Sequence, residues 1–325
     1  MKRLILPLIA AALLSPLTAV MAQSVPPQVS IVFKTQDLVP GGGTNAHFSS
    51  FGNPAFNDYN HVAFQASVSE VVQFPYPIVY AAKTASNSTA TNATNAVPVF
   101  PSYTNTWSGI WADNSSGARQ LVVRTAPPFI ADIGGFSWFS DPVYNNYNAV
   151  AFIANYNPGF IAILPGSTNF HGGIGVWTSH DLSTPVAFVG EPAPGYTNNA
   201  SFKSFDQIAL PDQGGVVMLA TVTATNYIYP PKSTNPLTPL YIILQQVNQQ
   251  GIWAQDTSGK LQLIARQGGV LNVRGTNKTI ASLCFMNSTN PVSGQTRHFS
   301  QDTGNILFKA TFNDGSQAGV KVIFP

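Results

Sequence analysis

Two acidic residues, Asp37 and Glu191, are the clearest candidates for chemistry in this chain. They occupy matching places before a Pro-Gly turn in two similar segments, 36–51 and 190–205. A pair of carboxylates roughly 5–10 Å apart is the arrangement that glycoside hydrolases use as acid and nucleophile or base. The competing interpretation is structural, with each carboxylate accepting backbone N–H bonds in its own turn. We therefore treat Asp37 and Glu191 as a candidate acid pair.

Aromatic side chains form the second group of candidates, because several lie in long insertions between predicted strands. Exposed rings stack on sugar rings, and uncharged polar neighbours hydrogen-bond to sugar hydroxyls. The competing interpretation is that these rings anchor the insertions to the rest of the protein. The candidate ligand-binding residues are Tyr76, Tyr80, Tyr103, Trp107, Phe170, His171, Tyr229 and Tyr241.

Other reactive residue types carry no recognisable pattern. The five histidines share no metal-binding spacing. Cys284 lies in an apolar run, as a buried thiol does. Asp113, Asp256 and Asp314 lie in Gly-containing turns, with too few carboxylates nearby to form a calcium cage. The sequence predicts no catalytic residue, no metal site and no cofactor.

Four diverged copies of one repeat must position these side chains. Residues 57–64 match residues 145–152 at six of eight positions. The 16 residues from Gly109 match the 16 from Gly251 at nine positions, and the 16 from Gln36 match the 16 from Gly190 at seven. Because the matches recur in the same order, we predict four equivalent structural units.

Each unit is predicted to contain four antiparallel strands. The first strands are 31–34, 121–124, 186–189 and 261–264, and the second strands include 48–56 and 136–144. The third strands are 62–64, 150–152, 216–218 and 306–308, and the fourth begin at Gly109, Gly175, Gly251 and Gly319.

Two recurring residue types support the predicted hairpins. Turns before the third strands contain Asn60, Asn148, Gly214 and Gly304, which tolerate positive φ. The recurring aromatic residues, which we expect to pack in the core, are Trp111, Trp177, Trp253, Phe64 and Phe152. No segment shows sustained helical periodicity.

The predicted fold is all-β: a propeller-like ring of four four-stranded antiparallel blades, closed by pairing of the N- and C-terminal strands. The alternative is an open stack of β-repeats or a barrel. The predicted boundaries are a signal peptide over 1–22 and a single β-repeat domain over 23–325. The repeats cover approximately 30–117, 118–183, 184–259 and 260–325.

The N-terminal segment and the charge balance predict location and exclude some partners. Lys2 and Arg3 precede an apolar run from Leu4 to Leu14, and cleavage is expected near Ala22. Removing those two basic residues from 15 leaves 13, against 13 acidic residues. A net charge of zero argues against nucleic acid as a partner. We expect a secreted or periplasmic bacterial protein with no membrane span after cleavage.

The Asn-x-x-Asn/Gly-x-x-Ala-Phe signature at 57–64 and 145–152 resembles the bacterial exported "choice-of-anchor" NxxGxxAF tandem-repeat proteins. Weaker copies lie at 211–218 and 301–308. The resemblance implies an exported repeat protein and carries no established activity. The chain ends at Pro325 without an apolar tail, from which we expect soluble export rather than surface anchoring.

Two functions remain open at this point. The first is a non-catalytic binding or surface-associated protein that recognises a polysaccharide or a protein of the cell envelope. The second is a propeller-type polysaccharide hydrolase or lyase, which requires Asp37 and Glu191 to converge on one pocket.

Overall fold

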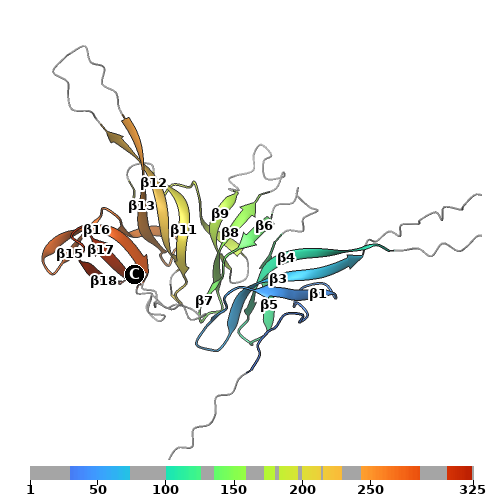
Figure 1. Cartoon of the computed structure of the whole chain (residues 1–325). Coiled ribbons are helices and arrows are strands. Elements are labelled where there is room, and N and C mark those ends of the chain that lie inside the picture. The colour runs from blue at the N-terminus through green and yellow to red at the C-terminus, as the bar shows by residue number, and fades with distance from the viewer. Residues whose placement is uncertain are drawn as a thin grey trace, which may run out of the picture. The chain divides into compact units, whose positions relative to one another are not determined.

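The computed structural model describes residues 30–73, 100–125, 135–158, 172–179, 183–196, 200–213, 215–228, 243–285 and 306–323. Contacts divide the chain into two units, residues 1–34 and 35–325, and all the strands belong to the second. The described residues contain β-strands and no helix (Figure 1). None of them forms a helix long and apolar enough to cross a membrane.

The first two sheets have the same plan, a meander of four strands plus a short accessory strand. The first contains β1 (Ala46–Phe51), β2 (Ala55–Phe56), β3 (Val62–Gln73), β4 (Ser102–Asp113) and β5 (Arg119–Arg124). The second contains β6 (Gly135–Phe139), β7 (Val143–Tyr144), β8 (Val150–Asn157), β9 (Gly173–Ser179) and β10 (Ser183–Phe188).

The third and fourth sheets have four strands each. The third contains β11 (Ser201–Ala209), β12 (Val217–Ile228), β13 (Ile243–Gln255) and β14 (Leu261–Arg266). The fourth contains β15 (Val270–Val273), β16 (Thr276–Phe285), β17 (Ile306–Phe312) and β18 (Gln317–Val322). All strand pairs within the sheets are antiparallel, as expected for hairpin connections.

The hydrophobic core is divided among the three junctions between consecutive sheets. One buried cluster joins Ile110 of the first sheet to Phe152 and Trp177 of the second. Further clusters join the second sheet to the third and the third to the fourth. The structure therefore establishes four antiparallel sheets that pack against one another in chain order.

The recurring aromatic residues pack as predicted. Trp111, Trp253, Phe64 and Phe152 are completely buried, and Trp177 is 6% exposed. The indole N–H of Trp111 donates to the carbonyl of Pro40 at 3.0 Å, and that of Trp253 donates to the carbonyl of Pro194 at 3.0 Å. These equivalent bonds confirm the alignment of the first and third repeats.

The turn prediction is also confirmed at two of its four positions. Asn60 and Asn148 adopt φ values of 63° and 61°, the left-handed conformation for which Asn is favoured over most side chains. Gly214 and Gly304 lie outside the described residues.

Two strand predictions need correction. Residues 31–34 form no strand, and Ile31 and Val32 are 79% and 52% exposed. In the fourth sheet, Phe308 pairs with Val320 as Phe64 pairs with Trp111, so the residue equivalent to Gly109 is Ala318 and not Gly319. β18 contains no Trp, so residue identity alone selected the wrong register.

Each of the first three sheets also crosses a predicted repeat boundary. The strand that begins the next repeat is the outer neighbour of the Gly-Ile-Trp or Gly-Val-Trp strand, as β5 is of β4, β10 of β9 and β14 of β13. In the fourth sheet β18 pairs with β17 alone among the described strands.

Candidate functional site

The signature asparagines connect neighbouring sheets. Asn57 accepts hydrogen bonds from the N–H groups of Tyr59 and His61 at 3.1 and 3.0 Å, which closes its own turn. Its side-chain amide then donates to the carbonyl of Asn145, the equivalent residue of the next repeat, at 3.1 Å. One buried side chain therefore both shapes a turn and attaches it to the following sheet.

Asn145 repeats this arrangement one sheet further along. It accepts from the N–H groups of Tyr147 and Ala149 at 3.1 and 2.9 Å and donates to the carbonyl of Pro211 at 3.1 Å. Beside this buried row runs an outer one, in which the Asn146 amide donates to Asp58 at 3.0 Å and to Asp212 at 2.9 Å. The turns of the first three sheets thus form one continuous polar edge.

A cavity of about 260 Å³ opens beside this edge, at the junction of the first two sheets. We call it the junction cavity. The first sheet contributes the end of β4, the following turn and β5, and the second contributes the Asn145 turn, β8 and the end of β9. Its polar lining consists of Asp113, Asn114, Ser115, Gln120, Tyr147, Asn148 and Ser179.

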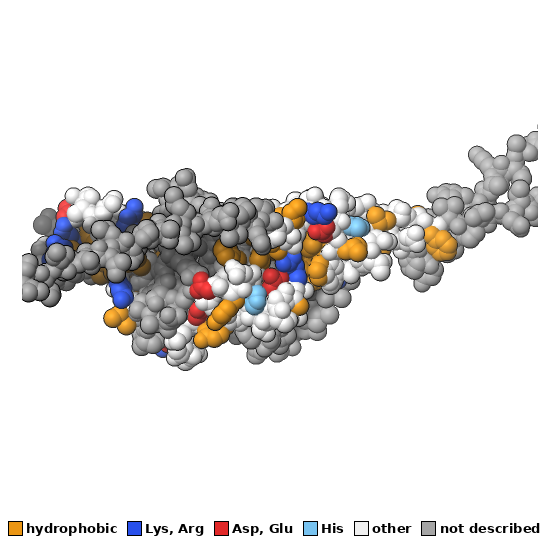
Figure 2. Space-filling view, turned by 90° about the horizontal axis from the view of Figure 1, so that it is seen from below, with side chains coloured by type: hydrophobic (Ala, Val, Ile, Leu, Met, Phe, Trp, Pro, Cys, Tyr) orange, Lys and Arg blue, Asp and Glu red, His pale blue; other side chains and the backbone are white. Residues whose placement is uncertain are grey.

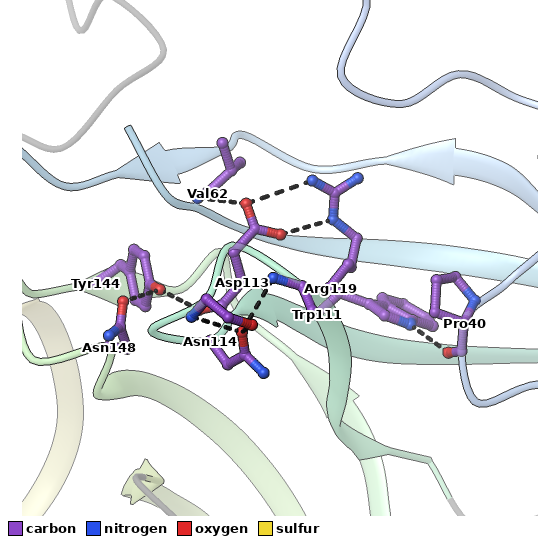
Figure 3. A network of polar contacts seen from close by, with 10 residues as sticks. Pro40, Val62, Trp111, Asp113, Asn114, Arg119, Tyr144 and Asn148 are labelled. Carbon is purple, nitrogen blue, oxygen red and sulfur yellow. Dashed lines mark hydrogen bonds and ion pairs between the residues drawn. The ribbon is translucent and has the colours of Figure 1, made fainter. Parts of the chain in front are cut away.

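A hydrogen-bond network fixes the orientation of Asn148 (Figure 3). Its side-chain oxygen accepts from the His61 ring at 2.9 Å and lies 2.7 Å from the Tyr144 hydroxyl, which also contacts the Asp113 carbonyl. Burial, reinforced by the Asp113 carboxylate, raises the pKa of Tyr144 far above its usual range, so the phenol stays a neutral donor. The Asn148 oxygen is occupied, which leaves its amide nitrogen for other partners.

Among the described residues that line this cavity, the one carboxylate is compensated. Asp113 accepts from the Val62 N–H at 3.0 Å and pairs with the Arg119 guanidinium at 3.1 Å, while its side chain is 8% exposed (Figure 3). A buried carboxylate with a cation and a backbone donor is stable in its charged form. The junction cavity therefore offers mainly neutral amide and hydroxyl groups.

Charged side chains elsewhere are scattered. On the face seen in Figure 2, acidic, basic and histidine side chains lie among hydrophobic and neutral polar ones without a broad patch of one sign among the described residues. No group of three or more potential metal ligands occurs in the described part of the chain.

Of the predicted aromatic site residues, only two are described. Tyr103 lies half-buried in β4, opposite Val72. Trp107 is 5% exposed, donates to Glu70 at 3.1 Å and is covered by Arg124 at 5.3 Å from its ring centre. Trp107 therefore packs within the protein instead of presenting an exposed ring. The residues outside the described part are Tyr76, Tyr80, Phe170, His171, Tyr229 and Tyr241.

The candidate acid pair occupies equivalent loops before the first and third sheets. The backbone carbonyls of Asp37 and Glu191 accept from the N–H groups of Phe48 at 3.1 Å and Phe202 at 2.9 Å, respectively. The Glu191 carboxylate also accepts from the Phe188 N–H at 2.8 Å. That contact matches the structural interpretation of a carboxylate that closes its own turn.

Sequence reasoning missed the junction cavity. Its exposed aromatic residue, Tyr147, lies inside the signature turn, where Tyr59 recurs at the equivalent position. That recurrence was the available signal, but the residues that line the cavity with Tyr147 include Asn114 and Gln120, which lie 33 and 27 residues away in the chain.

Comparison with known proteins gives a family without an activity. The model of a family of unknown function, DUF7453, matches residues 81–231 and 241–324. No curated protein matches the chain, and no solved structure does.

Proposed function

The chain belongs to the DUF7453 family, whose function is unknown, and we propose that it is an exported, non-catalytic protein that binds a neutral polysaccharide in the junction cavity. The observation that carries this proposal is Tyr147, which is 59% exposed and borders a cavity lined by neutral amides and hydroxyls. An aromatic ring beside such groups is suited to a sugar, whose ring stacks while its hydroxyls form hydrogen bonds.

Size and charge favour the same class of ligand. The volume of about 260 Å³ lies just below the roughly 300–1,000 Å³ typical of sites for drug-sized molecules. It therefore suits one or two rings of a longer chain. The compensated Asp113 provides no free charge for an ionic ligand.

The test measures binding of the full chain to a panel of soluble polysaccharides by affinity electrophoresis and calorimetry. The panel contains neutral glucans, mannans and xylans, with polygalacturonate as the charged comparison. Tyr147→Ala is expected to weaken binding to the preferred neutral polymer at least about tenfold, since exposed aromatic anchors dominate such sites. Tyr59→Ala is the matched control, because Tyr59 is 64% exposed at the equivalent turn position. No binding by the unaltered chain, or equal effects of the two variants, contradicts the proposal.

We also propose that the four sheets close into a ring. In the first three sheets an outer strand pairs with the Trp-containing strand, with Arg124 opposite Gly109 and Arg266 opposite Gly251. Residues 31–34 hold the corresponding place in the sequence. In the proposed ring, the same register would bring Lys34 opposite Ala318 and Ile31 opposite Val320.

Disulfide trapping tests this closure. Ile31→Cys combined with Val320→Cys is expected to give an intramolecular cross-link under mild oxidation, seen as a shift in gel mobility. Ile31→Cys combined with Leu307→Cys is the control, since Leu307 lies on β17 and is 39% exposed. Equal cross-linking of both pairs, or none in the first, argues against a closed ring.

Export and the repeat resemblance belong to the same proposal. The equivalent turns at Asn57 and Asn145 support the resemblance to exported NxxGxxAF repeat proteins. Mass spectrometry of the protein from a secreting cell is expected to show cleavage near Ala22, and a retained N-terminus would contradict export.

A further inference from the structure

Two equivalent pairs of side chains differ between the first and third repeats. Asn114 and Gln120 follow β4 in the first repeat, and Asp256 and Gln262 take the same places after β13, since Ala112 pairs with Gln120 as Ala254 pairs with Gln262. The comparison of these pairs shows which polar groups are needed for the turn and which are left over.

The turns themselves are the same. The Asn114 side-chain oxygen accepts from the Ser116 N–H, the Ser116 hydroxyl and the Ala118 N–H at 3.0, 2.7 and 3.0 Å. The Asp256 oxygen accepts the equivalent three bonds at 2.9, 2.6 and 3.0 Å. Either residue type therefore builds this turn with one side-chain oxygen.

The second side-chain atom is used differently. In the third repeat, the other Asp256 oxygen accepts from the Gln262 amide at 2.6 Å, so the pair is satisfied internally. In the first repeat, the Asn114 nitrogen and the Gln120 amide form no such bond with each other or with another described residue, and both residues line the junction cavity. The Asn148 nitrogen is left over in the same way, because its oxygen is occupied by His61 and Tyr144.

We infer that Asn114 and Gln120 are specificity-determining residues of the junction cavity, and that they form hydrogen bonds with adjacent hydroxyl oxygens of a neutral sugar ring. This inference rests on the proposed function. An amide nitrogen only donates, so Asn114 requires an acceptor on the ligand, and the Gln120 amide both donates and accepts. Vicinal hydroxyls supply that combination, with one oxygen accepting from Asn114 while its neighbour bonds to Gln120. The nearby Tyr147 ring would cover the apolar face of the same sugar.

The repeats supply a substitution that changes the chemistry and keeps the turn. Asn114→Asp reproduces the natural side chain of the third repeat, so the turn is expected to form as it does at Asp256. The variant replaces a donor with an anionic acceptor facing the cavity. Asp256→Asn makes the reverse change in the third repeat and is the matched control. Gln120→Ala tests the second member of the pair, which is exposed on β5.

The experiment measures the affinity of the full chain and of these variants for the neutral polysaccharide bound best in the panel. Asn114→Asp is expected to weaken binding at least about tenfold and Gln120→Ala about threefold to tenfold, with no change for Asp256→Asn. Circular dichroism spectra identical to those of the unaltered chain show that the fold is kept. If Tyr147→Ala abolishes binding while Asn114→Asp and Gln120→Ala leave it unchanged, the proposed function stands and this inference falls. If the unaltered chain binds none of the polymers, both fall.

Discussion

Replacement of Asn145 by Ala tests whether the signature asparagine joins two sheets. The substitution removes three hydrogen bonds: those from the Tyr147 and Ala149 N–H groups and the one to the Pro211 carbonyl. Asn145 is 4% exposed, so water cannot replace these partners. At a net value of about 1 kcal/mol for each bond, the free energy of unfolding should fall by about 3 kcal/mol.

Urea unfolding followed by far-UV circular dichroism measures that change. The control is Asn155→Ala on β8 in the same sheet, where the amide makes one exposed bond to Ser137 at 2.8 Å and should contribute less than about 0.5 kcal/mol. A loss at Asn145 no larger than the loss at Asn155 would refute the reasoning.

Three further outcomes are expected. Gly195→Ala should destabilise the protein more than Gly259→Ala in thermal unfolding. Both residues have positive φ, but only at Gly195 would the new Cβ lie 2.6 Å from a Leu263 side-chain atom. Equal effects of the two variants would contradict the steric argument. Trp253→Phe should lower the free energy of unfolding, measured in urea, by about 1–3 kcal/mol. The substitution replaces a completely buried indole with a smaller ring and removes the hydrogen bond to the Pro194 carbonyl. No change in the free energy of unfolding would show that the site tolerates repacking. Hydrogen bonds, first from the Ser258 hydroxyl, lower the pKa of Asp256 to about 2. The contribution of the Asp256 carboxylate to folding stability is therefore present above about pH 4 and lost as the pH falls toward 2. Over that interval the melting temperature of Asp256→Asn should fall less steeply than that of the unaltered chain, and parallel curves would exclude this role.

The fold was predictable to the extent that repetition encodes it. Trp111 and Trp253 recur at one position, and a residue that recurs in diverged copies is a sound indicator of core packing. Asn60 and Asn148 were predictable as left-handed turn residues because few other side chains tolerate that backbone. The register of β18 was not, since Val320 replaces the Trp that identifies the strand elsewhere.

The candidate site was not predictable in the same way. Tyr147 and Asn114 meet because the sheets stack, and the bond from Asn57 to Asn145 spans 88 residues. No local pattern encodes such a distance. The aromatic insertions attracted attention for their composition, but composition alone could not distinguish the buried Trp107 from an exposed ring.

The buried row of asparagine bonds, from Asn57 and Asn145, has a direction. Asn57 needs only its own turn to use its oxygen, whereas its amide finds its acceptor on the sheet that follows in the chain, and Asn145 does the same with Pro211. During synthesis, a completed turn therefore presents an open donor to the next sheet as that sheet leaves the ribosome, and each sheet can be captured in order of translation. Pro211, with no side-chain donor, ends the series of donors in this buried row.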